Sequence, residues 1–68
     1  MIETSIKNAR KSKGLTQAEL AKLMGVHQTN ITAWEKGKWL PTAKKLIKLS
    51  QLLDCTVDEL LMPEATEA

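Results

Sequence analysis

The chain has 68 residues, which leaves room for one domain, and a domain of this size buries only about 60% of its unfolded surface. No apolar run approaches the roughly 18 residues of a membrane span, and the single cysteine, Cys55, cannot form an internal disulfide, which suits a reducing cytoplasm. The net charge of +2 conceals a polarity: residues 1–48 carry all ten basic residues and three acidic ones, whereas residues 49–68 carry five acidic residues and no basic one. A basic segment followed by an acidic end is typical of a module that binds the phosphates of a nucleic acid through one face.

Two short helices are expected in the first third of the chain. The first spans residues 3–13 and ends at Gly14. The second spans residues 17–24, because Thr16 and Glu19 have the spacing of a capping box. Apolar residues recur at helical spacing, and those expected to face inward from the two helices are Ile6, Ala9, Leu20, Leu23 and Met24.

A glycine turn joins the second helix to a third. Gly25 stands where a helix needs a left-handed residue to stop, and the next helix is expected over residues 28–36, ended by Gly37. Val26, Ile31 and Trp34 continue the apolar face, while the opposite side holds Gln28, Thr29, Thr32 and Ala33. Two short helices joined by a tight glycine turn form a helix-turn-helix unit.

The loop after the third helix, residues 38–41, contains an unusually apolar pair. Leu40 is expected in the core. Trp39 either covers the seam between the first and fourth helices or is an exposed ring that touches DNA backbone, and we favour packing. Thr42 is expected to cap the fourth helix, which points Lys44, Lys45 and Lys48 outward and Leu46, Ile47, Leu49, Leu52 and Leu53 inward.

A second capping box, Thr56 to Glu59, opens a short fifth helix that reaches about Met62. Pro63 ends it, and residues 63–68 are expected to form a flexible acidic tail outside a domain of residues 1–62. The sequence contains no strand signal. The expected fold class is therefore all-α, a compact five-helix domain with a helix-turn-helix at its second and third helices.

The segment from Ile6 to Leu61 resembles the DNA-binding domain of phage lambdoid repressors, Cro proteins and the bacterial Xre-type regulators. The matching residues are Arg10, Gly14 to Ala21, Gly25, Val26, Ile31, Trp34 to Gly37, Pro41, Leu46 to Leu53 and Val57 to Leu61. The resemblance covers nearly the whole chain. It implies a lambda-repressor-like fold and double-stranded DNA as the partner.

In this family the exposed start of the third helix contacts bases, which implies base contacts by Gln28, Thr29, Thr32 and Ala33. The residue types agree: Gln can pair bidentately with adenine, and Thr and Ala can pack on a thymine methyl group. The family also uses a Gln at the position of Gln17 to hold a phosphate. The phosphate contacts expected here are Gln17, Asn30, Lys36, Lys38 and Lys44.

Arg10 and Glu35 are expected to form a structural salt bridge rather than to contact DNA, because the family pairs an Arg on the first helix with a Glu at the end of the third. His27 precedes the third helix where Ser or Thr often caps, so it caps poorly, donates to a phosphate or lies in solvent. No metal site is expected, because one His and one Cys form no ligand cluster, and no cofactor or small-molecule ligand is evident.

One recognition helix reads too few base pairs to select a genomic site, which predicts a dimer on a palindromic operator. The surface expected to form the dimer interface is the acidic end: Cys55, Thr56, Val57, Asp58, Leu61 and Met62. A patch this small predicts weak self-association in solution that is reinforced on DNA.

The sequence therefore predicts a sequence-specific DNA-binding transcriptional regulator, a repressor, in the bacterial cytoplasm or encoded by a phage and associated with the nucleoid. The alternative is an antitoxin-like or adaptor module whose main role is to bind a partner protein. No enzyme is expected, because the chain has no nucleophile–base pair, no phosphate-cradling glycine loop and no carboxylate cluster.

Overall fold

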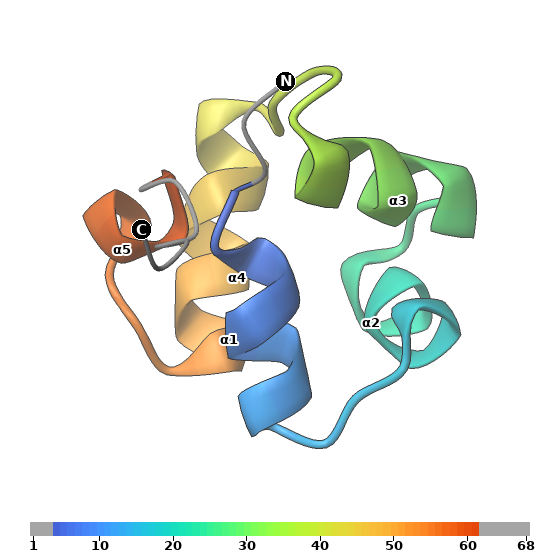
Figure 1. Cartoon of the computed structure of the whole chain (residues 1–68), viewed down its shortest axis with the longest axis horizontal. Helices are drawn as coiled ribbons and strands as arrows, with labels where there is room; N and C mark the ends of the chain where they lie inside the picture. The colour runs from blue at the N-terminus through green and yellow to red at the C-terminus, as the bar shows by residue number, and fades with distance from the viewer. Residues whose placement is uncertain (1–3, 62–68) are drawn as a thin grey trace, which may run out of the picture.

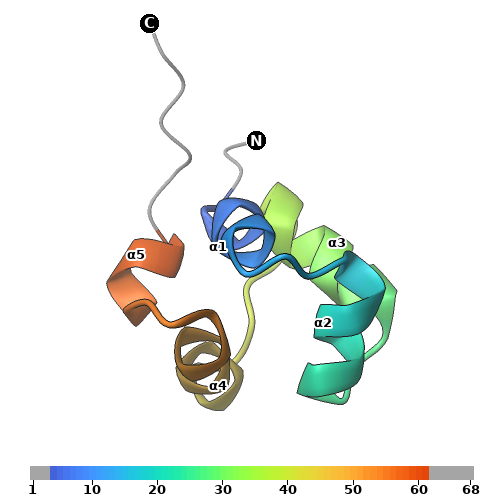
Figure 2. The same ribbon diagram turned by 90° about the horizontal axis from the view of Figure 1, so that it is seen from below.

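The computed structural model describes residues 4–61, and within that range every regular element is a helix. The helices are α1 (Ile6–Ser12), α2 (Gln17–Met24), α3 (Gln28–Lys36), α4 (Ala43–Leu53) and α5 (Val57–Leu61). The views in Figures 1 and 2 place α2 and α3 at one end of the molecule, α4 and α5 at the other, and α1 between them. The five-helix all-α prediction is confirmed. The predicted end of the fifth helix at Met62 and the predicted tail of residues 63–68 lie outside the described residues.

The helix ends follow the local signals in the sequence. Thr16 accepts from the Glu19 N–H at 3.0 Å while the Glu19 carboxylate accepts from the Thr16 N–H at 2.8 Å, which completes the expected capping box. Thr56 and Glu59 make the same reciprocal pair at the start of α5. Thr42 caps α4 by accepting from the Lys45 N–H.

The first helix is shorter than predicted because the residues before it bind other parts of the fold. The Thr4 hydroxyl donates to the Trp34 carbonyl at 2.9 Å, and its N–H donates to the Glu35 carbonyl at 3.1 Å. The Ser5 N–H donates to the Leu60 carbonyl at 3.2 Å. These bonds join the start of the chain to the ends of α3 and α5, and helical structure begins only at Ile6.

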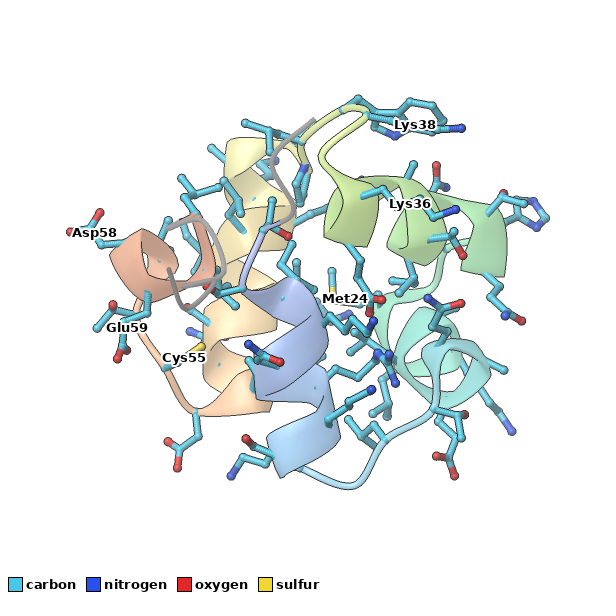
Figure 3. All side chains as sticks on the ribbon, viewed as in Figure 1. Met24, Lys36, Lys38, Cys55, Asp58 and Glu59 are labelled. Carbon is cyan, nitrogen blue, oxygen red and sulfur yellow. The ribbon has the colours of Figure 1, made fainter. Side chains whose placement is uncertain are left out.

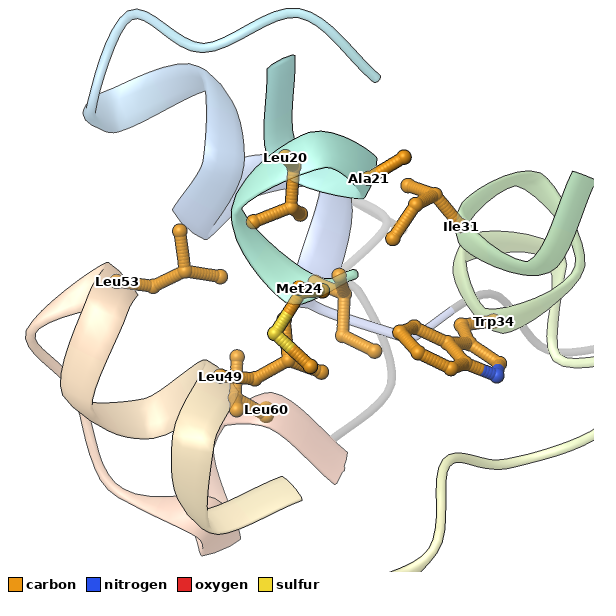
Figure 4. Close-up of a cluster of buried hydrophobic side chains, with 9 residues drawn as sticks. Leu20, Ala21, Met24, Ile31, Trp34, Leu49, Leu53 and Leu60 are labelled. Carbon is orange, nitrogen blue, oxygen red and sulfur yellow. The ribbon is translucent and has the colours of Figure 1, made fainter. Parts of the chain in front are cut away.

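The core draws at least one fully buried side chain from every helix: Ile6, Leu20, Ile31, Leu49 and Leu60. Figure 4 shows the cluster that these residues form with Ala21, Met24, Trp34 and Leu53. Each helix is too short to be stable alone, so its stability depends on packing its buried side chains against the other helices. The core therefore holds α2 and α3 against α1, α4 and α5.

Three residues expected to face inward are exposed: Leu23 at 48%, Ile47 at 53% and Leu40 at 55%. Ile47 lies two residues before the buried Leu49, which places it about 200° away around the helix. Leu23 lies at the edge of the stripe that buries Leu20, Ala21 and Met24. Leu40 lies in the loop between α3 and α4, so helical spacing does not predict which way its side chain faces. In the part of the chain that is described, no helix is both long and apolar enough to cross a membrane.

Candidate nucleic-acid interface

The turn between α2 and α3 depends on Gly25. Gly25 has a left-handed backbone, with φ of +71°, and a Cβ added there would meet no heavy atom within 4 Å. The requirement for glycine is therefore conformational and not steric. The Val26 N–H donates to the Ala21 carbonyl at 3.0 Å and ends α2. The predicted helix-turn-helix geometry is confirmed.

The outer face of α3 begins with the residues expected to read bases. Gln28 and Thr29 are exposed and Thr32 is half-buried. Ala33, expected on the same free surface, is instead 4% exposed. Its carbonyl accepts from the Lys38 N–H at 2.9 Å, a bond that closes the C-terminal end of α3. The exposure expected for Ala33 is therefore wrong, although the residue lines a groove along α3, and its base contact stays a prediction.

Gln17, the first residue of α2, joins the two helices through its side-chain amide. Its Nε2 donates to Glu35 Oε1 at 2.9 Å. Because a carboxylate only accepts hydrogen bonds, this contact turns the amide oxygen toward α3. That oxygen accepts from Thr32 Oγ1 at 3.0 Å and from Gln28 Nε2 at 3.3 Å. Gln17 thus orients two of the expected base-contacting side chains.

The predicted pair of Arg10 and Glu35 lies behind this amide. Arg10 Nε donates to Glu35 Oε2 at 2.5 Å and its Nη2 to Oε1 at 3.4 Å. The Arg10 Nη1 donates to the Leu15 carbonyl at 2.8 Å. The two side chains are 9% and 4% exposed, so Arg10 presents no charge to a ligand. The expectation of a structural ion pair is confirmed.

Besides Gln17, the expected phosphate contacts are three lysines and Asn30. Lys36 at its end, Lys38 in the following loop and Lys44 at the start of α4 are exposed, and Asn30 is half-buried. A small pocket of about 100 Å³ lies beside Gln17, lined by Lys7, Gln17, Thr32, Glu35 and Lys36. Figure 3 shows Lys36 and Lys38 at the α3 end of the molecule and Asp58 and Glu59 at the opposite end. These four charged side chains are therefore separated in space, although α4, which packs beside α5, also carries Lys44, Lys45 and Lys48.

A second, larger groove of about 260 Å³ lies along the adjacent face of α3 and shares Thr32 and Lys36 with the small pocket. Its lining residues are Thr29, Thr32, Ala33, Lys36, Lys38 and Trp39. Trp39 is 52% exposed, so the favoured expectation that it packs as a lid is wrong. The exposed ring is the alternative that the sequence left open, and its place beside α3 has no signal in the sequence because a loop has no regular spacing.

His27 occupies the N-cap position of α3 and makes no side-chain capping bond. The absence of a capping bond fits the alternative of poor capping, and the exposed side chain leaves both the phosphate contact and the position in solvent as predictions. No group of three or more potential metal ligands occurs within residues 4–61.

At the acidic end, Thr56 and Asp58 are exposed, Leu61 is 38% exposed, and Cys55 and Val57 are half-buried. Burial raises the pKa of the Cys55 thiol, and the carboxylates of Glu59 and Asp54 raise it further. The thiol therefore stays protonated at neutral pH and acts as a small packing group. Met62, also expected at the dimer interface, lies outside the described residues.

Comparison with known proteins agrees with this geometry, since residues 6–60 match the family model described as helix-turn-helix. The chain belongs to the helix-turn-helix family. It is 39% identical over 67 residues to the transcriptional regulator YqaE of Bacillus subtilis and 35% identical over 66 residues to the phage CTXphi repressor RstR of Vibrio cholerae. These matches cover 98% and 97% of this chain, which spans 58% and 59% of the two relatives.

A solved structure of a DNA-binding protein from Bacteroides fragilis has a similar fold. The TM-score is 0.79 at 29% sequence identity, and the match covers 91% of this chain and all of that one. The expected likeness to phage repressors and Xre-type regulators is confirmed by these matches.

Proposed function

We propose that this protein is a transcriptional repressor that binds a palindromic operator as a dimer, with α3 in the major groove. The observation that carries the proposal is the outer face of α3, where Gln28 and Thr32 are uncharged, accessible and oriented by Gln17. Family membership supports DNA binding, and the relative named a phage repressor supports repression. We place its action in the cytoplasm, on the nucleoid, and assign it no enzymatic role.

Gln28 is the residue we propose for adenine. One N–H of its amide is engaged by Gln17, which leaves the second N–H and the carbonyl oxygen free. These two groups match the N7 acceptor and the N6 donor that adenine presents in the major groove. Thr29 and Thr32 are proposed to contact neighbouring bases.

Phosphate contacts are proposed for Gln17, Asn30, Lys36, Lys38 and Lys44. Gln17 retains one amide hydrogen that Glu35 does not engage, and it opens a helix whose N-terminus favours an anion. Lys36 lines the pocket beside Gln17, and Lys36 and Lys38 line the groove along α3, so both add positive charge next to the reading face. Such contacts set the position of the helix on the duplex without reading its sequence.

Dimerisation is proposed through the acidic end, at Cys55, Thr56, Val57, Asp58, Leu61 and Met62. This end lies opposite Lys36 and Lys38, so pairing there leaves both reading faces free. The carboxylates of Asp58 and Glu59 repel their copies, which predicts weak association without DNA. On DNA, two such copies would read half-sites about one helical turn apart.

The test is selection from a random pool of duplexes at near-physiological salt, followed by affinity measurements. We expect a palindromic winner that binds about 10³-fold or more tightly than scrambled DNA. Gln28→Ala should remove most of this preference, whereas Gln51→Ala, which changes an exposed glutamine on α4, should leave it intact.

A partner-binding role is the second candidate, and the exposed apolar side chains of Ile47 and Leu61 on α4 and α5 favour it. Selection that enriches no sequence, together with binding that depends on salt alone, would contradict the repressor proposal. That result would leave partner binding through α4 and α5 as the better account.

A further inference from the structure

We propose that Trp39 is a DNA-contacting residue whose indole packs on a deoxyribose of the strand that borders α3, between phosphates held by Lys36 and Lys38. This inference rests on the proposed function and extends it to a residue outside the helix-turn-helix.

The exposure of Trp39 is the first observation. The two tryptophans of the chain differ sharply, since Trp34 is 3% exposed in the core and Trp39 is 52% exposed. A large aromatic ring left half in water is a common feature of binding surfaces. Trp39 also lines the 260 Å³ groove whose other walls include Thr29 and Thr32.

The backbone determines where the ring lies. Gly37 adopts a left-handed conformation with φ of +75°, and the Lys38 N–H then donates to the Ala33 carbonyl. Pro41, two residues after Trp39, is buried. The loop is thus held at both ends by contacts that do not involve the indole, so the ring can be removed without loss of the fold.

The chemistry of the groove indicates its occupant. None of its six lining residues is acidic, and the two lysines beside the ring are exposed. The base faces of an intact duplex are stacked, so a ring at the edge of the major groove meets the apolar carbon face of a sugar between two charged phosphates. A strand whose bases reach Thr29 and Thr32 would continue past Trp39, because one groove contains all three side chains.

The test compares Trp39→Ala with Leu40→Ala. Leu40 is the adjacent residue, is 55% exposed and does not line the groove. Affinities would be measured for the selected operator and for a scrambled duplex over a range of salt concentrations. We expect Trp39→Ala to weaken binding to both duplexes by about 5- to 30-fold without changing the salt dependence. Leu40→Ala should change either affinity by no more than about twofold.

A second measurement follows the ring itself. Acrylamide should quench the fluorescence of wild-type protein mainly through Trp39, and saturating operator DNA should reduce that quenching. In Trp39→Ala only the buried Trp34 remains, and DNA should then leave the quenching unchanged.

Wild-type affinity in Trp39→Ala, or equal quenching with and without DNA, would overturn the inference. A loss confined to the operator and abolished when a thymine is replaced by uracil would assign the ring to a thymine methyl group and overturn the sugar contact. Wild-type protein that binds no duplex would overturn the proposed function itself, whereas tight binding that ignores Trp39 would overturn this inference alone.

Discussion

At the scale of single residues, Glu35 is a buried carboxylate that needs both a counter-charge and hydrogen-bond donors. Its carboxylate accepts from Arg10 and from Gln17, and it is 4% exposed. A buried ion is tolerated only when its charge and its hydrogen bonds are both matched. The same carboxylate therefore holds the fold together and, through Gln17, orients the reading face.

Glu35→Ala should lower the free energy of unfolding by about 3–5 kcal/mol, because it leaves the Arg10 guanidinium buried without a counter-charge. Urea unfolding monitored by circular dichroism measures the loss. Lys13→Ala is the control, since it breaks the exposed pair of Lys13 and Asp54 and should cost at most about 1 kcal/mol. An unchanged melting temperature in Glu35→Ala would refute the structural role.

Two other residues show what residue types alone do not reveal. Asp54 ends α4 in the left-handed region, with φ of 59°, a position that glycine more often takes. Thr4 is 5% exposed and binds the carbonyl of Trp34. Neither role is marked by the residue type, because Asp54 stands where glycine is more common and the partner of Thr4 lies 30 residues away in the chain.

At the scale of elements, the turn between α2 and α3 determines how the reading face is presented. The α2 side chains Leu20 and Ala21 lie in the core cluster with Ile31 and Trp34 of α3. Gly25 permits the change of direction between the two helices, and the amide of Gln17 links their outer surfaces.

Gly25→Ala should cost about 1–2 kcal/mol of stability, since an L-residue is strained in the left-handed region. Gly14→Ala is a matched control, because Gly14 has φ of +70° and equally open surroundings. We expect similar losses in thermal unfolding for both variants, but weaker operator binding only for Gly25→Ala, where relief of strain shifts α3. Equal DNA affinities for the two variants would contradict this role of the turn.

At the scale of the whole molecule, Lys36 and Lys38 lie at the end of the fold opposite the carboxylates of α5, although α4, which packs beside α5, also carries Lys44, Lys45 and Lys48. The exposed lysines near α3 lie away from the carboxylates of α5. Displacement of condensed cations from DNA makes such binding steeply dependent on salt. The acidic end adds no attraction for DNA and so favours one orientation of the domain on the duplex.

Lys36→Gln should reduce the slope of log affinity against log salt by about 0.9, the value for one lost phosphate contact, and should weaken operator and scrambled DNA alike. Titration at several salt concentrations measures the slope. Lys13→Gln, at a lysine paired with Asp54, should leave the slope unchanged. A slope that is the same in both variants would show that Lys36 does not contact phosphate.

Much of this architecture could be predicted from the sequence, because its determinants are local. The capping pairs at Thr16 and Thr56, the glycines at the ends of α2 and α3, and the apolar spacing of Leu20, Ile31 and Leu49 each act within one or two turns of helix. The pair of Arg10 and Glu35 was expected from family resemblance, not from local pattern.

Tertiary structure alone decided which side chains remain free at the edges of elements. Ala33 is buried, whereas Leu40 and Trp39 are exposed. The hydrogen bonds of Gln17 to Glu35, Thr32 and Gln28 depend on three segments meeting. The physical reason is that helix formation depends on near neighbours in the chain, while burial depends on residues distant in sequence that fill the same space.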